Sequence, residues 1–438
     1  MPKIAFIGAG SVIFPRMLVN DILMFEELLD SEIVLMDIDH ERLDLIHRLM
    51  ARLAKQEGLP TRFSATADRR EAVDGADYVV VAFQVGGLEA YRLDVDIPLK
   101  YGVDQCVGDT LGPGGVFRGL RSIPEHRKLL DDMEELCPNA FLLNYANPMA
   151  INCKAIADYS EVVSVGLCHG VQHTANMLAD WAGVAADEVD YWVAGINHMA
   201  WFLRVEHNGE DLYPRLWEVL DEKYETTHEK YRIEMMRATG YFMTESPGHL
   251  SEYIPYFRKR KDLLEKYNGP GFGGETKAHY NMCLAGKDHY LDEIRRQIEG
   301  VEPVPFRRYR SVEYAANIIH AHQTGEEFRL NGNVLNTGLI TNLPEGSCVE
   351  VPCYVDKMGI HPAFVGDLPE VCAALNRTNV NVQNLAAEAG LWGDREKAYQ
   401  AVLLDPLTAA VLSPAEIRQM VDEMFEAEKR WLPQFEEE

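Results

Sequence analysis

Residues 3–11 read Lys-Ile-Ala-Phe-Ile-Gly-Ala-Gly-Ser, a short apolar run followed by two closely spaced glycines. The run predicts a buried β-strand, and the glycines predict a tight turn into a helix. Gly8 permits the turn, and Gly10 lets the backbone approach a pyrophosphate, which the free N–H groups of the next helix then receive. The third glycine of such a loop is absent, since Ile13 stands at its place. We therefore expect a nucleotide site that includes Gly8, Gly10 and Ser11.

A carboxylate follows the next expected strand. Asp37 stands at the end of residues 32–36, where it can hydrogen-bond a ribose hydroxyl and would repel a 2′-phosphate, so it favours NAD over NADP. Gly86, just past the third strand, lies where a parallel sheet binds its cofactor. These strands are continuous apolar runs that alternate with helices, which predicts a doubly wound parallel α/β sheet of the Rossmann type. Further strands are expected at 77–83, 140–144 and 162–167, and helices at 16–29 and 42–56.

The two halves of the chain differ in pattern. We expect the nucleotide-binding domain to cover residues 1–190. From residue 191 on, charged helical stretches such as 215–223 dominate, with short strands at 191–194 and 346–355. This pattern predicts an α+β domain over residues 191–438, which binds substrate and forms the contacts of an oligomer.

Composition excludes several classes of partner. The formal net charge of −27, from 69 acidic and 42 basic residues, argues against binding to nucleic acid or to anionic membranes. The apolar run at residues 4–7 is too short for a signal peptide, and no stretch reaches the roughly 18 apolar residues of a membrane helix. The eight cysteines form no CxxC pair and no regular framework, which indicates reduced thiols. We expect a cytoplasmic protein.

Polar side chains follow three of the expected strands. Asn147, the pair Cys168 and His169, and His198 each come within a few residues of a strand end. The carboxyl ends of parallel strands meet at one edge, where ligands bind. A thiolate and an imidazole at that edge can share one borderline-soft divalent cation. Taken singly, a buried cysteine or a strand-end histidine is more often a packing residue, so spacing alone leaves both interpretations open.

Several motifs extend along almost the whole chain. They are GAGS at 8–11, DID at 37–39, DTLGPGG at 109–115, NYANPM at 144–149, CHGV at 168–171, GINH at 195–198, NLP at 342–344, VEVP at 349–352 and DP at 405–406. Together they resemble glycoside hydrolase family 4. Within that family the chain looks most like the α-galactosidases, or melibiases, with which it shares residues 109–115, GLCH at 166–169 and TES at 244–246.

The resemblance implies an unusual hydrolysis. Most glycosidases place two carboxylates around an oxocarbenium-like transition state, and this NAD-dependent family is an exception. In the family, NAD+ takes a hydride from sugar C3, and the resulting ketone acidifies the proton at C2. A base removes that proton, the aglycone is eliminated, water adds at C1, and the hydride returns. Mn2+ stabilises the charge on the C2 and C3 oxygens. Configuration is retained, and no cofactor is consumed.

The resemblance also implies residue roles at the centre of the site. Cys168 and His198 are the protein ligands of Mn2+, and Asn147 contacts the substrate. His169 stands where some relatives carry the acid that protonates the leaving oxygen. A thiolate ligand would make the activity depend on reducing conditions.

The C2 base is expected within residues 241–253, where relatives use a tyrosine or an aspartate. Tyr241 and Glu245 are therefore the catalytic candidates, and His249 is a candidate base or substrate contact. We favour Tyr241, because a phenol beside a metal can have its pKa lowered enough to act as a base. An ordinary half-buried aromatic is the alternative interpretation of Tyr241.

One residue departs from the melibiase pattern. Gly170 stands where melibiases carry serine, whereas some α-glucosidases and uronidases of the family have Cys-His-Gly. The same chemistry on α-glucosides, α-galacturonides or α-glucuronides therefore stays open. Family members that act on phospho-sugars carry Asp or Asn in place of His169, so a 6-phosphate is not expected.

Two other classes of protein with the same nucleotide-binding fold are alternative interpretations. One is a 2-hydroxyacid dehydrogenase, which uses an Arg-rich substrate site and a His–Asp pair without a cysteine-bound metal. The other is a catalytically inert NAD-binding regulator. Fold alone does not separate these readings from a glycosidase. The resemblance further implies a homodimer or homotetramer that takes a small-molecule α-glycoside as substrate.

Overall fold

The computed structural model describes residues 1–286 and 290–435. In these residues, twelve strands form one mixed sheet. The strands are β1 (Lys3–Ile7), β2 (Glu32–Met36), β3 (Arg62–Thr66), β4 (Tyr78–Val81), β5 (Phe141–Asn144), β6 (Ser164–Leu167), β7 (Val189–Ile196), β8 (Met199–His207), β9 (Glu210–Asp211), β10 (Phe328–Leu335), β11 (Cys348–Asp356) and β12 (Gly359–Pro362).

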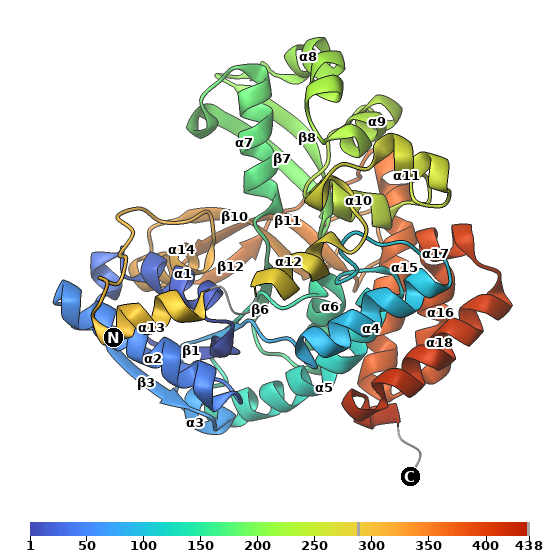
Figure 1. Cartoon of the computed structure of the whole chain (residues 1–438). Helices are drawn as coiled ribbons and strands as arrows, with labels where there is room; N and C mark the ends of the chain where they lie inside the picture. Colours follow the sequence, from blue (N-terminus) through green and yellow to red (C-terminus); the bar gives the residue numbers. More distant parts are fainter. Residues whose placement is uncertain (287–289, 436–438) are drawn as a thin grey trace.

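Helices follow most of the strands of the first half and dominate the second half (Figure 1). They are α1 (Ile13–Ile22), α2 (His40–Glu57), α3 (Arg69–Val73), α4 (Gly87–Lys100), α5 (Gly112–Leu136), α6 (Met149–Tyr159), α7 (Gly170–Ala182), α8 (Tyr213–Thr226), α9 (Lys230–Thr239), α10 (Pro247–Tyr253), α11 (Lys261–Tyr267), α12 (Ala278–Gly286), α13 (Leu291–Glu299), α14 (Ala315–Thr324), α15 (Glu370–Trp392), α16 (Arg395–Leu404), α17 (Pro406–Val411) and α18 (Pro414–Glu428).

The first six strands form the expected doubly wound sheet. Their order is β3-β2-β1-β4-β5-β6, and all of their pairings are parallel. Alternate residues of β1 enter two different cores. Ile4 and Phe6 pack with residues of α1 and α2, whereas Ala5 and Ile7 pack with residues of α3 and α5. Helices therefore cover both faces of the sheet, as the continuous apolar strands predict.

The second half extends the same sheet instead of building a separate one. After β6 the order continues β10-β11-β7-β8-β9, and each of these pairings is antiparallel. The strand expected at residues 191–194 lies in β7, which runs opposite to β6, so our expectation of a third parallel strand end at His198 is wrong. A division of the chain near residue 190 stays a prediction.

Other elements differ from the expectations in extent. The strands β3, β8, β9, β10 and β12 were not expected. Helix α1 ends at Ile22, short of the expected residue 29, and β4 ends at Val81, because the chain turns there toward Gly86. Strand β10 was not predicted because its buried Asn331 and Asn333 interrupt the apolar run. Their side-chain amides donate to the backbone oxygens of Val193 and Gly166, respectively.

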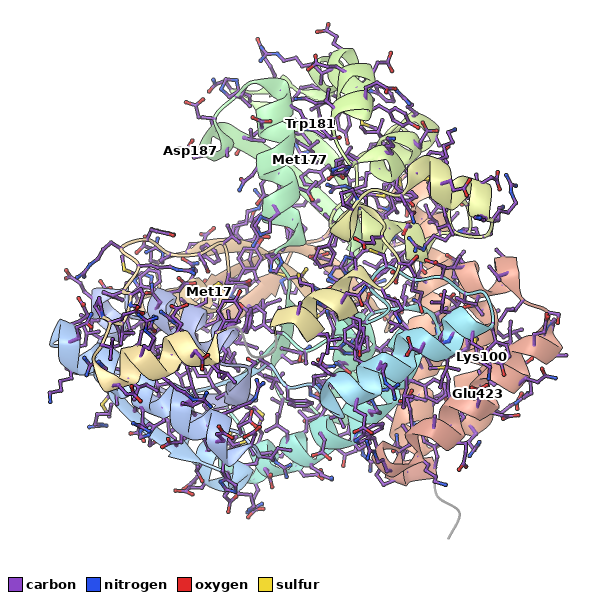
Figure 2. All side chains as sticks on the ribbon, viewed as in Figure 1. Met17, Lys100, Met177, Trp181, Asp187 and Glu423 are labelled. Atoms are coloured by element: carbon purple, nitrogen blue, oxygen red, sulfur yellow. The ribbon has the colours of Figure 1, made fainter. Side chains whose placement is uncertain are left out.

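The C-terminal helices pack on the first half of the chain. Helix α15 contacts α5 and α6, and α18 contacts α4. Figure 2 shows Lys100 of α4 beside Glu423 of α18, and their Nζ and Oε2 atoms lie 2.7 Å apart. In Figure 1, α7, β7, β8 and α8 project together away from the nucleotide-binding strands. Within the described residues, no helix is long and apolar enough to cross a membrane. All eight cysteines are free thiols.

Candidate active site

The loop after β1 has the geometry of a pyrophosphate-binding turn. Gly8 has φ +95°, and a Cβ atom there would lie 2.7 Å from the backbone nitrogen of Phe83. A Cβ atom on Gly10 would lie 2.7 Å from Oδ2 of Asp37, and the amide of Gly10 donates a 2.7 Å hydrogen bond to the same oxygen. Position 8 therefore requires glycine, and a side chain at position 10 would displace the carboxylate of Asp37. Ser11 ends this loop and is exposed to solvent.

Asp37 and Gly86 lie at neighbouring strand ends. Asp37 directly follows β2, and its Oδ1 also accepts a 2.9 Å hydrogen bond from the amide of Asp39. Gly86 precedes α4 with φ +80°, and a Cβ atom there would lie 2.4 Å from Cβ of Ala90. The residues expected to hold the nucleotide thus follow β1, β2 and β4, which are adjacent in the sheet.

The sheet register brings two distant segments to one level. Gly166 of β6 pairs with Asn333, Asn333 pairs with Glu350, and Glu350 pairs with Gly195 of β7. Cys168 leaves the sheet two residues after Gly166. His198 lies three residues after Gly195, in the β7–β8 turn, with φ +63°. Although β7 runs opposite to β6, the two side chains therefore leave the sheet close to the same row.

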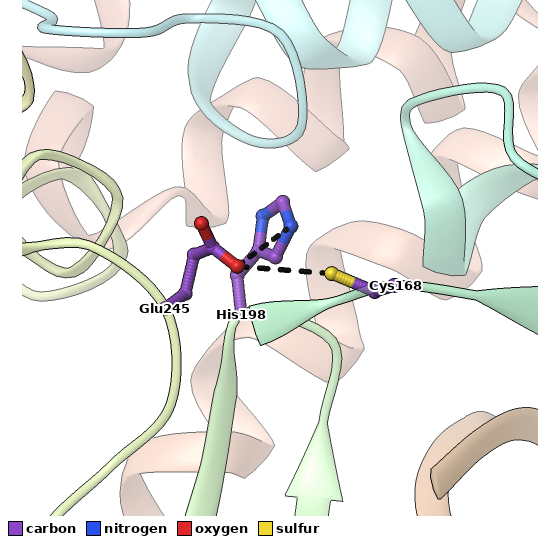
Figure 3. Close-up of side chains that lie close together, drawn as sticks. All are labelled: Cys168, His198 and Glu245. Atoms are coloured by element: carbon purple, nitrogen blue, oxygen red, sulfur yellow. Dashed lines mark hydrogen bonds and ion pairs between the residues drawn. The ribbon is translucent and has the colours of Figure 1, made fainter. Parts of the chain in front are cut away.

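Cys168, His198 and Glu245 form a cluster of possible metal ligands. One ligand atom from each lies within 4.8 Å of the others. Oε2 of Glu245 lies 3.7 Å from Sγ of Cys168 and 3.8 Å from Nε2 of His198, as the dashed lines in Figure 3 indicate. Nδ1 of His198 is buried and has no hydrogen-bond partner among the described residues. A sulfur, an imidazole nitrogen and a carboxylate oxygen together fit a divalent first-row metal.

Burial and mutual charge set the protonation of this cluster. Burial and the nearby carboxylate of Glu245 raise the pKa of the Cys168 thiol well above its usual value. Burial, reinforced by His249, lowers the pKa of His198 to about 4. Burial opposes ionisation of Glu245, but the neighbouring histidines, led by His198, outweigh it and lower its pKa to about 2. A cation bound here would convert the thiol to a thiolate. The amide of Gly170, 3.4 Å from Sγ, would stabilise that charge.

These side chains line a cavity of about 580 Å³, a volume within the usual range for small-molecule sites. Asn147, His169 and His249 line the same cavity, as does Phe14 from the helix that follows the nucleotide loop. The ring of Phe14 lies 4.7 Å from the ring of Tyr145. The cavity therefore extends from the metal-ligand cluster toward the nucleotide loop.

Models of known protein families match both halves of the chain. Residues 3–184 match the family 4 glycosyl hydrolases, and residues 193–408 match the C-terminal domain of the same family. This chain belongs to the family 4 glycosyl hydrolases. The resemblance that the motifs indicated is thereby confirmed, and so is the assignment of the chain to the glycoside hydrolases.

Individual relatives agree with this family. An α-galactosidase of Rhizobium meliloti (strain 1021) is 43% identical over 99% of this chain and 89% of its own length. An α-galactosidase of Bacillus subtilis (strain 168) is 42% identical over 99% of this chain and 100% of its own. The crystal structure of a 6-phospho-α-glucosidase from gut microorganisms in complex with NAD and Mn2+ has a similar fold. Its TM-score is 0.83 at 24% identity, over 99% of this chain and 100% of that one.

In this glycosyl hydrolase, His169 is paired with a carboxylate that the sequence did not reveal. Nδ1 of His169 lies 2.8 Å from Oε1 of Glu313, a residue 144 positions away. The hydrogen bond to Glu313 raises the pKa of His169 above its usual value. Nearly half of the His169 side chain stays exposed, while Glu313 is buried. A histidine whose pKa is raised at the edge of the cavity suits an acid that donates to a leaving group.

Asp109 is a second site residue without a role assigned from the sequence. It is buried in the cavity lining, and its Oδ2 accepts a 3.1 Å hydrogen bond from the side-chain amide of Asn147. His249 and His279 flank it, with ring nitrogens 3.8 and 3.7 Å from its carboxylate. Burial opposes ionisation of Asp109, but His249 and Arg118 outweigh it and hold its pKa well below the usual range. Asp109 could have been noticed as an acidic residue directly before a glycine-rich helix start, whereas His279 stands in no recognisable motif.

Tyr241, the residue favoured from the sequence as the C2 base, lies elsewhere. It lines a second cavity together with Tyr213 and Trp217, on the β8 side of the molecule. The structure brings Cys168, His198 and Glu245 together but does not bring Tyr241 into the cavity that they line.

Proposed function

We propose that this family 4 glycosyl hydrolase cleaves α-galactosides with retention of configuration, using NAD+ and Mn2+. One observation carries the proposal: a thiol and an imidazole suited to a divalent cation lie in the same cavity as a histidine of raised pKa and the side-chain amide of Asn147. The α-galactosidases of Rhizobium meliloti and Bacillus subtilis, similar to this chain over nearly its whole length, support the choice of sugar. A 2-hydroxyacid dehydrogenase would have no need of the cysteine–histidine pair.

The residues present fit both cofactors. Cys168 and His198 would hold the cation, because their ligand atoms converge within 4.8 Å, beside the carboxylate of Glu245. Gly8, Gly10 and Asp37 would hold the nucleotide, because a Cβ atom on either glycine would meet neighbouring atoms at 2.7 Å. The 6-phospho-α-glucosidase of similar fold, which holds NAD and Mn2+, supports this choice. When bound, NAD+ accepts and returns a hydride, and Mn2+ stabilises negative charge on sugar oxygens.

The relative positions of the two cofactor sites suit one sugar ring. The nucleotide loop follows β1 and Cys168 follows β6, and these parallel strands are separated by β4 and β5. Three strand spacings amount to about 14 Å, which a dinucleotide can span. Phe14 and Asn147 line the cavity between these ends. The ring to be oxidised would therefore lie between the nucleotide loop and Cys168.

Three side chains are proposed to act on the substrate. His169, kept protonated by Glu313, donates a proton to the leaving oxygen. Asn147, tied to Asp109 by a hydrogen bond, orients the sugar, and His249 contributes to the same wall of the cavity. For the C2 base, Tyr241 and Glu245 stay the proposed candidates. Of these two, Glu245 lines the cavity.

A second substrate class has one specific observation in its favour. Gly170, which departs from the melibiase pattern, leaves no room for a side chain while Glu245 keeps its position, because a Cβ atom there would lie 2.2 Å from Oε2 of Glu245. The Cys-His-Gly sequence thus suits this arrangement, and some α-glucosidases and uronidases of the family carry it. The α-glucosides and α-uronides are the alternative substrates.

Cellular context and assembly are proposed from the sequence. We propose a cytoplasmic enzyme, consistent with its free cysteines, that forms a homodimer or homotetramer. The division into a nucleotide-binding domain at residues 1–190 and a substrate-binding and oligomerisation domain at 191–438 is proposed as well. Light scattering coupled to gel filtration tests the oligomer, and a monomer would contradict it.

A sugar panel tests the substrate. The holoenzyme is assayed with p-nitrophenyl α-galactoside, α-glucoside and α-galacturonide in the presence of NAD+, Mn2+ and a thiol. We expect cleavage of the galactoside without net accumulation of NADH. If only another glycoside is cleaved, that sugar is the substrate and the galactoside is not. Steady accumulation of NADH would indicate a dehydrogenase.

Solvent isotope exchange tests the mechanism independently of the sugar. In D2O, removal and return of the C2 proton should place deuterium at C2 of the released sugar, which NMR detects. Hydrolysis with no deuterium at C2 would contradict an elimination mechanism.

A further inference from the structure

We infer that Glu245 is a third protein ligand of the divalent cation, and that Gly170 is the residue that makes room for it. This inference rests on the proposed function, which supplies the cation. It adds a carboxylate to the cysteine and histidine assigned from the sequence, and it gives Glu245 a role other than that of the C2 base.

The first argument is distance. A first-row divalent cation lies about 2.0–2.3 Å from oxygen, nitrogen and sulfur ligands, so two ligand atoms on one ion are about 3–4 Å apart. Oε2 of Glu245 lies 3.7 Å from Sγ of Cys168 and 3.8 Å from Nε2 of His198. The same oxygen approaches both partners (Figure 3). The sulfur and the imidazole nitrogen lie within 4.8 Å of each other. The carboxylate oxygen therefore lies at the distance from both partners that a shared ion requires.

The second argument is the space in front of Gly170. The ideal Cβ position of Gly170 lies 2.2 Å from Oε2 of Glu245, and its next nearest neighbours also belong to Glu245. Real Cβ atoms essentially never approach another atom so closely. A larger residue at position 170 would therefore require the carboxylate to shift from its present place beside Cys168. The position of the Glu245 carboxylate therefore depends on the absence of a side chain at Gly170, at the start of α7.

The third argument is backbone strain at two ligands. His198 has φ +63° and Glu245 has φ +72°, values that residues with a side chain rarely adopt. Strained backbone of this kind persists where the surrounding structure requires it, and such residues gather at functional sites. Here both strained residues direct a ligand atom to the same point.

The fourth argument is charge. A buried divalent cation requires compensating negative charge. A thiolate at Cys168 supplies one negative charge, and the ionised carboxylate of Glu245 supplies the second, while the imidazole of His198 stays neutral. The other carboxylate oxygen, Oε1, lies 3.8 Å from Nδ1 of His249. With three protein ligands, an octahedral ion would keep positions open for sugar oxygens.

The test measures Mn2+ affinity by electron paramagnetic resonance, without substrate and therefore without reference to activity. We expect Glu245→Gln to raise the Kd for Mn2+ about tenfold or more, which is at least the usual cost of disturbing a metal site. Gly170→Ala should raise the Kd to a similar extent by displacing the carboxylate. Because both changes remove one contact, the double variant should bind no more weakly than Glu245→Gln alone.

Two matched variants serve as controls. Asp109→Asn removes a buried carboxylate from the same cavity but outside the ligand cluster, and it should raise the Kd less than Glu245→Gln does, because no ligand is lost. Gly286→Ala adds a Cβ at a helical glycine with nothing within 4 Å and should leave the Kd unchanged. Circular dichroism melts establish that each variant folds. Glu245→Asp, which keeps the charge but shortens the reach, should also bind Mn2+ more weakly.

The outcomes separate this inference from the function on which it rests. If Cys168→Ser weakens Mn2+ binding but Glu245→Gln does not, the cation site exists and Glu245 is not its ligand. If Glu245→Gln binds Mn2+ normally and instead abolishes deuterium exchange at C2, Glu245 is the base. If neither Cys168→Ser nor His198→Ala affects the Kd, the proposed metal site itself is wrong. If Gly170→Ala and Glu245→Gln raise the Kd for Mn2+ independently and additively, Gly170 does not act through the Glu245 carboxylate.

Discussion

Nδ1 of His169 lies 2.8 Å from Oε1 of Glu313, and this hydrogen bond raises the pKa of the imidazole. If protonated His169 is the acid for the leaving group, activity falls as pH rises through its pKa. Glu313→Gln removes the charge that keeps His169 protonated. We therefore expect the alkaline limb of the pH profile of kcat to move to lower pH in this variant.

The matched control is a second histidine–carboxylate pair. Nε2 of His207 lies 3.2 Å from Oε2 of the exposed Glu188, on the far end of the β7–β8 hairpin. Glu188→Gln should leave the alkaline limb in place. A Glu313→Gln profile identical to that of the wild type would remove His169 from the role of acid.

Asp37 should decide between the two nicotinamide cofactors. Its carboxylate is held at the end of β2 by the amides of Gly10 and Asp39. Asp37→Ala should weaken NAD+ binding about tenfold, the cost of one hydrogen bond to a charged group, and should weaken NADP+ binding less, because the repulsion of a 2′-phosphate is lost. Calorimetric titration with both cofactors measures the ratio.

Asp39, two residues after Asp37, provides a control that affects helix stability but not cofactor recognition. Asp39 caps α2 by accepting hydrogen bonds from the amides of Glu41 and Arg42. Asp39→Ala should lower stability but leave the NAD+ to NADP+ ratio near that of the wild type. A shift of the ratio in both variants would mean that Asp37 acts through the fold of the loop.

Tyr241→Phe tests the base that the sequence favoured. Because Tyr241 lines a cavity other than the one with Cys168 and His198, we expect kcat to change by less than about threefold, well below the roughly 10²–10⁴-fold loss for a general base. Deuterium exchange at C2 should continue in this variant. If the variant loses both glycoside cleavage and deuterium exchange at C2 while its Mn2+ affinity stays normal, Tyr241 is the base.

The nucleotide half of the fold could be predicted because local sequence determines it. The continuous apolar runs of β1, β2, β4, β5 and β6 and the glycines of the first loop carry the information in consecutive residues. Strand β10 was missed because its buried asparagines look like surface residues until their partners on β6 and β7 are known. The antiparallel direction of β7 depends on β11, more than 150 residues away.

The site could be predicted in part for the same reason. Cys168, His198 and Asn147 follow strands and belong to recognisable motifs, and the cavity includes all three. Glu313 and His279 reach the site from distant segments in no motif, so no local signal marks them. The sequence also could not show which residue of the segment 241–253 faces the cavity, because this depends on how the loop before α10 packs against Gly170.

A buried ionic cluster that joins α4, α5 and α18 should be sensitive to the loss of one partner. Arg121 of α5 is fully buried, and its guanidinium pairs with Asp94 of α4 at 2.8 Å and with Glu428 at the end of α18. Arg121→Met keeps the apolar volume but leaves two buried carboxylates without their counter-ion. Because an unpaired buried charge is costly, we expect the free energy of unfolding to fall by about 3–5 kcal/mol.

Denaturant unfolding measures this loss, and a surface pair provides the comparison. Arg418 contacts Glu396 through two 2.8 Å hydrogen bonds, but both side chains are largely exposed. Arg418→Ala should therefore change stability little, because water and salt screen such pairs. The triple change Arg121→Met, Asp94→Leu and Glu428→Leu should recover much of the stability lost in Arg121→Met, since it removes the uncompensated charges as well. Equal losses in the single and triple variants would mean that packing, and not charge, makes Arg121 necessary.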